Sequence, residues 1–137
     1  MKEVFADTLY WIAVTYPDDM WHSFAVEAFK RLGPVHLVTT DEVLIEFLTA
    51  LSAAGAYYRR KAAGAVRGIL ASEDVTVLPQ SRATFLAGLD LYERRADKGY
   101  SLTDCVSMNA MRELGLAEIL TNDHHCEQAG FVVLIAR

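Results

Sequence analysis

The sequence predicts an α/β fold: a three-layer α/β/α sandwich built around a mainly parallel sheet of about five strands. Short, continuous apolar runs alternate along the chain with segments in which apolar residues recur at helical spacing, and this alternation is typical of βαβ units. The short runs are apolar throughout, which indicates strands that are buried on both faces. A chain of 137 residues has the length of one ordinary domain, so we expect a single domain over residues 1–137.

The predicted strands and helices follow from these runs in chain order. The strands are KEVFA from residue 2, VHLV from residue 35, DVTVL from residue 74, EILT from residue 118 and FVVLI from residue 131. The helices cover about residues 8–15, 18–32, 40–54, 57–72, 81–97 and 103–115. Because Gly and Pro interrupt regular structure, boundaries are expected at Gly33-Pro34, Gly55 and Gly99.

The predicted helix over residues 40–54 separates structural from free acidic residues. Its apolar positions follow the i, i+3, i+4, i+7 pattern of a helix face that packs on a core. These positions are Leu44, Phe47, Leu48 and Leu51. Thr39 and Glu42 have the spacing of a capping box, in which Thr39 caps the helix and Glu42 reaches back. Glu46 lies off the apolar face and one turn beyond the cap, so it is free for chemistry.

The composition predicts a cytoplasmic protein without a membrane span. Apolar residues make up 53% of the chain, yet no run approaches the ~20 uninterrupted apolar residues that a span requires. We attribute the apolar excess to a buried sheet and a surface for self-association. The N-terminal segment carries Glu3 and Asp7 and lacks the cleavage pattern of a secretory signal. Cys105 and Cys126 lack the paired spacing of a disulfide framework, so we expect buried, reduced thiols.

The net charge of −5 argues against a protein that coats nucleic acid, because nonspecific binding to phosphates needs a basic surface. It does not exclude a nuclease, because metal ions held in an acidic pocket present positive charge to the phosphate. Two basic stretches are candidates for the surrounding surface, although each alone is more simply a solvated helix face. They are Arg59, Arg60, Lys61 and Arg67 in one helix, and Arg94, Arg95 and Lys98 at the end of another.

Four carboxylates fall where a parallel α/β fold brings side chains together. Asp7 and Asp123 follow predicted strands, Asp104 stands at a helix start, and Glu46 lies in the helix after the second strand. Strands of a parallel sheet end at one edge and the return helices begin there, so these residues converge across a crevice. Carboxylates that lie close together raise one another's pKa unless a cation neutralises them. Oxygen-only ligands suit Mg²⁺ or Mn²⁺, whereas the consecutive side chains of 124–126 (His-His-Cys) diverge and are not expected to chelate zinc.

Capping of helix N-termini is the structural alternative for each acid taken singly. The candidate caps are Asp7 before the helix at Thr8, Asp104 in an S-x-x-D pattern with Ser101, and Asp123 before a short turn through His125. Glu46 caps nothing, and Thr103 offers an alternative cap beside Asp104. At least two of the four acids are therefore left for another role.

The segment order and these acids resemble the PIN-domain ribonucleases, especially the VapC-type toxins of bacterial and archaeal toxin-antitoxin pairs. The resemblance covers nearly the whole chain, and its strongest pieces are S-L-T-D before a helix and T-x-D followed by A-G-F. The matching segments are VFADTLYW with Asp7, TTDEVLIEFLTAL with Glu46, YSLTDCVSMNAM with Asp104, and ILTNDHHCEQAGF with Asp123.

The resemblance implies a metal-dependent endoribonuclease, a hydrolase of RNA phosphodiester bonds that is the toxin of a toxin-antitoxin pair. The residues that would bind Mg²⁺ or Mn²⁺ are Asp7, Glu46, Asp104 and Asp123, with Thr121 assisting the site. The resemblance further implies the α/β/α sandwich, a homodimer, and a cognate antitoxin whose peptide enters the active-site groove.

One position within this pattern has alternatives, and another departs from the family. Asp41 and Glu42 are alternatives to Glu46, and both the helical spacing and the family pattern favour Glu46. Cys126 stands where the family often has an aromatic residue, a departure expected to change packing under the last turn and to leave the ligands unchanged.

Other protein classes with an acid after the first strand fit less well. Haloacid-dehalogenase phosphatases need D-x-D, which Asp7-Thr8-Leu9 lacks, and receiver domains need a Lys late in the sheet, where this chain has VVLIAR. A non-catalytic PIN-like module that binds RNA or protein is the alternative, although it has no need of four acids. The aromatic residues near the N-terminus are expected mainly in the core, and any exposed ones are candidates for a dimer or antitoxin surface. They are Tyr10, Trp11, Tyr16, Trp21 and Phe24.

Overall fold

A computed structural model describes residues 1–136 and contains a five-stranded, fully parallel sheet. Its strands are β1 (Lys2–Ala6), β2 (Val35–Thr40), β3 (Val75–Leu78), β4 (Glu118–Leu120) and β5 (Val132–Val133). The spatial order is β3-β2-β1-β4-β5, so the chain first winds outward from β1 in one direction and then returns to continue in the other. The carboxyl ends of β1 and β4 therefore flank the crevice at the topological switch point, where open α/β sheets bind their ligands.

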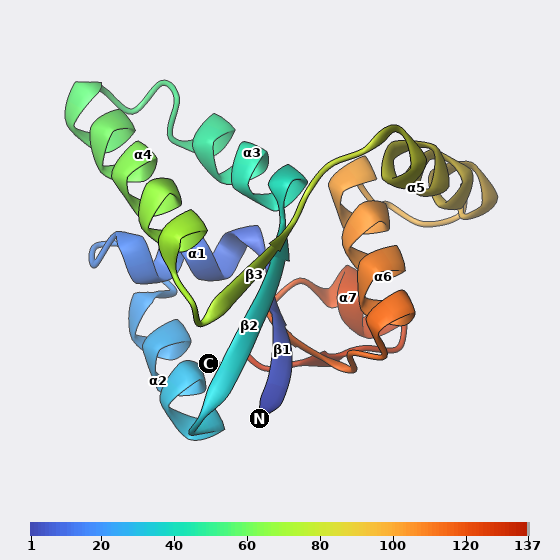
Figure 1. Ribbon diagram of the computed structural model, residues 1–137, viewed down its shortest axis with the longest axis horizontal. Helices are drawn as coiled ribbons and strands as arrows, with labels where there is room; N and C mark the ends of the chain where they lie inside the picture. The colour runs from blue at the N-terminus through green and yellow to red at the C-terminus, as the bar shows by residue number, and fades with distance from the viewer. Residues whose placement is uncertain (137) are drawn as a thin grey trace.

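Helices cover both faces of the sheet. They are α1 (Thr8–Thr15), α2 (His22–Leu32), α3 (Asp41–Ala50), α4 (Ala56–Ala71), α5 (Arg82–Arg94), α6 (Leu102–Leu114) and α7 (His124–Gln128). In Figure 1, α1, α2 and α4 lie on one side of the sheet and α6 and α7 on the other, while α3 lies beyond the carboxyl ends of the strands. The predicted α/β/α sandwich is confirmed. Over residues 1–136, no helix combines the length and apolar content needed to cross a membrane.

The core forms on both faces of the central strand because that strand is apolar at every inner position. Val4, Phe5 and Ala6 are consecutive in β1 and all fully buried, as predicted for a strand covered on both sides. Phe47 from α3 and Met108 from α6 are also fully buried. Burial of each such large side chain contributes about 1.5 to 3 kcal/mol relative to exposure.

The N-terminal aromatic residues and both cysteines belong mainly to this core. Tyr10, Trp11 and Tyr16 are buried, so the core interpretation is confirmed for them. Trp21 and Phe24 are partly buried and pack against the same core. The two cysteines, Cys105 and Cys126, are free and buried, as expected.

Several element boundaries differ from the prediction because side chains compete locally for backbone groups. The second helix begins at His22 and not at residue 18, since Asp19 accepts a hydrogen bond from the backbone N–H of Trp21 and holds a turn there. The third helix ends at Ala50 and not at residue 54, with the Ser52 hydroxyl donating to the Thr49 carbonyl just past its end. β5 comprises two residues of the predicted FVVLI run.

The predicted capping box of α3 is wrong by one residue. Thr40 caps the helix, because its hydroxyl oxygen accepts the backbone N–H of Val43 at 3.1 Å. Thr39 is fully buried at the end of β2, and its hydroxyl donates to the Ala6 carbonyl at 2.9 Å. Thr39 therefore ties β2 to β1, and α3 begins with a simple Thr40 cap.

Candidate metal centre

An acidic pocket of about 510 Å³ opens at the carboxyl ends of β1 and β4, at the topological switch point. Its lining includes all five residues that the sequence singled out for the site: Asp7, Glu46, Asp104, Thr121 and Asp123. They come from the ends of two adjacent parallel strands and from α3 and α6. The predicted convergence of residues that are remote in sequence is therefore what the structure shows.

Asp7 is the most buried acid of the pocket, with 8% of its surface exposed. It occupies the N-cap position of α1 but makes no side-chain capping bond, so a capping role is not observed. Instead, the Thr121 hydroxyl donates to Asp7 Oδ2 at 3.0 Å, and the Thr121 oxygen accepts the backbone N–H of Asp123 at 3.3 Å. Thr121 thus fixes Asp7 to the end of β4.

Burial raises the pKa of Asp7 to about 6. The backbone N–H of Thr8 and the Thr121 hydroxyl oppose this rise, while the negative charges of Asp104 and Glu46 add to it. A carboxylate held this way is costly to ionise unless a cation compensates its charge.

Glu46 enters the pocket from the middle of α3, where its Oε1 accepts a short hydrogen bond from the Thr8 hydroxyl. The other two acids of α3 point elsewhere. Asp41 accepts the backbone N–H of Gln80 at 2.9 Å, and Glu42 lines a different pocket. The geometry thus separates Glu46 from the two alternatives that the sequence left beside it.

Asp104 has both a structural role and a place in the pocket. Ser101 and Asp104 form a capping box at the start of α6, with Asp104 Oδ2 accepting the backbone N–H of Ser101 at 2.9 Å. Ser101 is the N-cap, so the predicted Ser101–Asp104 cap forms and the alternative cap at Thr103 is not used. Burial raises the pKa of Asp104, the charge of Asp123 adds to the rise, and His125 opposes it.

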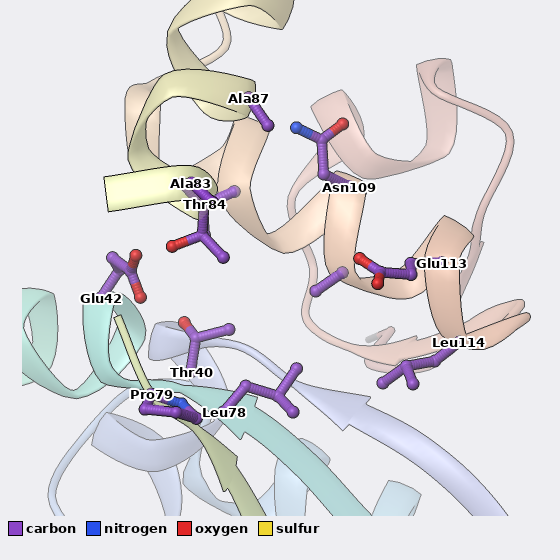
Figure 2. Close-up of a pocket in the computed structure, with 12 residues that line it drawn as sticks. Thr40, Glu42, Leu78, Pro79, Ala83, Thr84, Ala87, Asn109, Glu113 and Leu114 are labelled. Atoms are coloured by element: carbon purple, nitrogen blue, oxygen red, sulfur yellow. The ribbon is translucent and has the colours of Figure 1, made fainter. Parts of the chain in front are cut away.

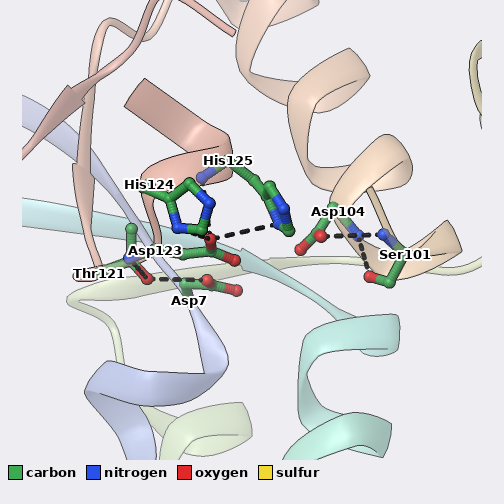
Figure 3. Close-up of polar contacts among 7 residues, drawn as sticks. All are labelled: Asp7, Ser101, Asp104, Thr121, Asp123, His124 and His125. Carbon is green, nitrogen blue, oxygen red and sulfur yellow. Dashed lines mark hydrogen bonds and ion pairs between the residues drawn. The ribbon is translucent and has the colours of Figure 1, made fainter. Parts of the chain in front are cut away.

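Asp123 caps α7 as predicted, with its Oδ1 accepting the backbone N–H of His125 at 2.9 Å. Figure 3 shows Asp104 and His125 extending toward each other from α6 and α7, with Asp123 and Asp7 beside them. Asp104, Asp123 and His125 each offer a ligand atom, and these atoms all lie within 4.8 Å of one another.

His125 is a pocket residue with a metal-binding side chain that sequence reasoning missed. The divergence expected of three consecutive side chains does occur: Cys126 is buried, and the His124 side chain is 71% exposed. The middle residue, however, turns back toward the acids, so an imidazole nitrogen lies beside the carboxylate oxygens that the sequence predicted as ligands. The available signal was the spacing of Asp123 and His125, because an Asp at a helix N-cap holds the backbone of the second residue after it.

The donor set of the pocket fits a divalent cation. Burial and repulsion from neighbouring acids make the bare anions of Asp7 and Asp104 unfavourable, and an ion with two positive charges reverses that balance. The Cys126 thiol lies beneath them, and its pKa is raised by burial and by the charges of Asp7, Asp123 and Asp104. A thiol kept protonated is a poor metal ligand, so the oxygens and the imidazole of His125 are the donors that remain.

A second hollow, of about 480 Å³, lies between α5, α6 and the end of β3 (Figure 2). Its lining is mainly apolar, and the acids at its rim, Glu42 and Glu113, extend from different helices. It lacks the convergent polar groups of the acidic pocket, which is therefore the candidate for chemistry.

A parallel sheet of this order with acids at its switch point defines a known class of protein. The chain belongs to the PIN-domain family, whose model matches residues 4–132. Its relatives include VapC20 of Mycobacterium tuberculosis, described as a 23S rRNA-specific endonuclease, in the strains CDC 1551 / Oshkosh and ATCC 25618 / H37Rv. In each strain the identity is 28% over 131 residues, which cover 94% of this chain and 95% of the relative.

The crystal structure of M. tuberculosis VapC20, described as a toxin that cleaves the sarcin-ricin loop, matches this fold with a TM-score of 0.85. The match has 26% sequence identity and covers 97% of this chain and 99% of that one. The family predicted from the sequence is confirmed, and the endonuclease names of the relatives agree with the predicted activity.

Proposed function

We propose that this protein is a metal-dependent endoribonuclease that acts as one domain. The observation that carries the proposal is the convergence of Asp7, Glu46, Asp104 and Asp123 in one pocket at the switch point of a PIN-domain fold. No arrangement of a nucleophile with a general base is needed for such a site, because a divalent ion lowers the pKa of bound water and stabilises charge on the scissile phosphate.

Four carboxylates divide this work between them. Asp7, Asp104 and Asp123 would hold Mg²⁺ or Mn²⁺ directly or through water. Glu46 would complete the shell or orient the attacking water.

Two hydroxyls orient these carboxylates before any substrate binds. The Thr121 hydroxyl donates to Asp7, and the Thr8 hydroxyl donates to Glu46. Thr121 follows β4, and Thr8 is the first residue of α1, just after β1. Both hydroxyls therefore lie at the edge of the sheet, where each one fixes the direction of the carboxylate that it contacts. Such support sets ligand direction, and its loss typically costs about 10- to 100-fold in metal affinity or activity.

The substrate class that the relatives support is ribosomal RNA. A relative described as a 23S rRNA-specific endonuclease and a sarcin-ricin-loop-cleaving toxin matches nearly the full length of this chain. We therefore propose cleavage of a structured ribosomal RNA loop in the cytoplasm, and control by a cognate antitoxin protein. Release from that antitoxin would expose the pocket to RNA.

The test uses purified, partner-free protein with 23S rRNA, a sarcin-ricin loop hairpin and an unrelated structured RNA, in Mg²⁺, Mn²⁺ or chelator. Glu46→Gln is expected to lower the rate of metal-dependent cleavage by more than about 100-fold. Glu42→Gln is the matched control, because it makes the same change one turn earlier in α3 but faces the other pocket, and it should cut like wild type.

The outcomes separate the candidate functions. Cleavage of the hairpin alone supports the ribosomal target, and cleavage of all three RNAs supports a nuclease of broader specificity. Metal binding without cutting of any RNA contradicts the proposed substrate. A protein that neither binds metal nor cuts RNA would instead be a PIN-like RNA-binding or protein-interaction module.

We also propose that the protein forms a homodimer through the outer face of α5, which consists of Phe85, Leu86, Leu89 and Tyr92. These residues are between 41% and 52% exposed, although a helix of a monomer normally turns its apolar side to the core. α5 meets α6 through Gly88, where an added Cβ would lie 2.8 Å from Val106 Cγ2. The remaining apolar side chains of α5 are thus left facing outward.

Leu89→Asp is expected to weaken dimerisation by at least about tenfold, because it places a charge in the apolar centre of this face. Molar mass measured by light scattering after gel filtration, across micromolar concentrations, reports the change. Leu70→Asp is the matched control, since Leu70 is an exposed leucine on α4, at 57% against 44% for Leu89. A wild-type monomer at all concentrations, or a dimer insensitive to Leu89→Asp, would count against this interface.

A further inference from the structure

The imidazole of His125 is held in a fixed place at the rim of the acidic pocket. Gly99 lies against it, because a Cβ built on Gly99 would approach His125 Nε2 to 3.2 Å. The Tyr100 ring meets it edge-on, with 5.8 Å between ring centroids, and the His124 ring lies 4.5 Å away on a tilt. Three neighbours therefore restrict the ring, and the lack of a side chain at Gly99 makes room for it.

The ring faces the acids, but its nitrogen does not make a close hydrogen bond with them. Its Nδ1 lies 3.4 Å from Asp123 Oδ1, beyond the usual 2.9–3.0 Å of an N–H···O hydrogen bond. That Oδ1 atom already accepts the backbone N–H of His125. Asp104, Asp123 and His125 still present one ligand atom each within 4.8 Å, a span that a single ion bound at about 2.1 Å can bridge after small shifts.

We propose that His125 is a nitrogen ligand of the same ion that Asp104 and Asp123 bind, and that it makes the site select Mn²⁺ over Mg²⁺. This inference rests on the proposed metal-dependent function and deepens it. Mg²⁺ is a hard ion that dehydrates reluctantly and keeps oxygen ligands and waters, whereas Mn²⁺ accepts the same oxygen ligands but, as a transition-metal ion, binds an imidazole nitrogen more readily than Mg²⁺ does. One imidazole among carboxylates thus adds affinity for Mn²⁺ while giving little to Mg²⁺.

The direct test is pulsed electron paramagnetic resonance of the Mn²⁺-loaded protein, which detects the ¹⁴N nucleus of a coordinated imidazole without requiring any RNA cleavage. Wild type is expected to show this coupling, and His125→Gln is expected to lose it. Titration calorimetry should show that His125→Gln lowers Mn²⁺ affinity by about tenfold or more, with a much smaller change for Mg²⁺. His36→Gln, at a partly buried histidine of β2 that is bonded to Thr76 and lies outside the acidic pocket, is the matched control and should match wild type.

Failure of this inference and failure of the proposed function give different results. Mn²⁺ that binds without ¹⁴N coupling, or His125→Gln with an unchanged ratio of Mn²⁺ to Mg²⁺ affinity, overturns the ligand assignment and leaves the acidic metal site standing. A wild-type protein that binds neither ion overturns both.

Gly99→Ala tests the packing that positions the ring while every ligand stays present. The added methyl would press on Nε2, so the imidazole must move by a few tenths of an ångström. We expect a few-fold loss of Mn²⁺ affinity and a changed ¹⁴N coupling, with Mg²⁺ affinity unchanged. Gly99→Ala protein with wild-type coupling and affinity would show that Gly99 does not position His125.

Discussion

Asp7→Asn is expected to abolish RNA cleavage and at the same time to stabilise the metal-free protein. Cleavage should fall by more than the roughly 10- to 100-fold that loss of a supporting residue costs, because Asp7 is itself a proposed ligand. Stability should rise because the wild-type carboxylate is buried beside other acids. An asparagine oxygen can still accept the Thr121 hydroxyl, so the local hydrogen bond is kept.

The size and pH window of this effect follow from the pKa of Asp7. Burial raises it from 3.8 to about 6, so between these values the folded protein binds a proton more tightly than the unfolded chain does. The free energy of unfolding therefore falls as pH rises through this range. Above about pH 6 the ionised Asp7 costs about 3 kcal/mol, at 1.36 kcal/mol for each pKa unit. Asparagine carries no charge at any pH and removes this cost.

Urea unfolding in chelator at pH 7.5 and pH 4 measures the difference. We expect Asp7→Asn to be more stable than wild type by about 1 to 3 kcal/mol at pH 7.5, and the gain to disappear near pH 4. Adding Mn²⁺ should stabilise wild type and have little effect on the variant. Asp18→Asn, the same change at an exposed site, is the control and should alter neither property. A destabilised Asp7→Asn at pH 7.5, or one that cuts RNA normally, would contradict the assignment.

The convergence of the acids was predictable because it depends on topology and not on side-chain detail. Continuous apolar runs separated by helical segments imply a parallel sheet, and a parallel sheet places strand ends and helix starts at one edge. Asp7 and Asp123 follow strands that prove to be neighbours, β1 and β4. Glu46 and Glu42 lie one helical turn apart, so periodicity alone places them on a similar face; the structure separates them, because they line different pockets.

What the sequence could not predict depends on contacts between segments that only the folded chain brings together. His125 faces the acids because Gly99 and Tyr100, from the loop before α6, restrict its ring. The cap of α3 shifted by one residue because Thr39 is committed to β2, bonding the Ala6 carbonyl across the sheet. Sequence spacing permits both caps, and strand pairing decides between them.

The exposure of the apolar face of α5 could not be predicted from periodicity either. A helix whose apolar residues pack on the core and one whose apolar residues face outward can have the same pattern. Here the buried positions of α5 are Gly88 and Leu91, while larger side chains such as Leu86 and Tyr92 remain exposed. The apolar excess predicted a self-association surface, and the structure supplies the exposed face that we propose for it.

Substitutions at Asp104 can separate the chemistry of the site from folding, because the Asp104 carboxylate both lines the acidic pocket and caps α6. Asp104→Asn should lose cleavage as completely as Asp7→Asn, yet keep α6 intact, since an asparagine oxygen can accept the backbone N–H of Ser101. Asp104→Ala should lose cleavage and also about 0.5 to 1.5 kcal/mol of stability, because the capping box is broken.

The matched control for the cap lies in the neighbouring helix. Ser81 and Thr84 form the same capping box at the start of α5, away from the acidic pocket. Thr84→Ala should therefore lose a similar amount of stability and still cut RNA at the wild-type rate. Thermal unfolding paired with cleavage rates for the three variants measures both properties. If Thr84→Ala also stopped cleavage, or if Asp104→Asn retained it, the loss of activity would reflect helix capping and not the charge at Asp104.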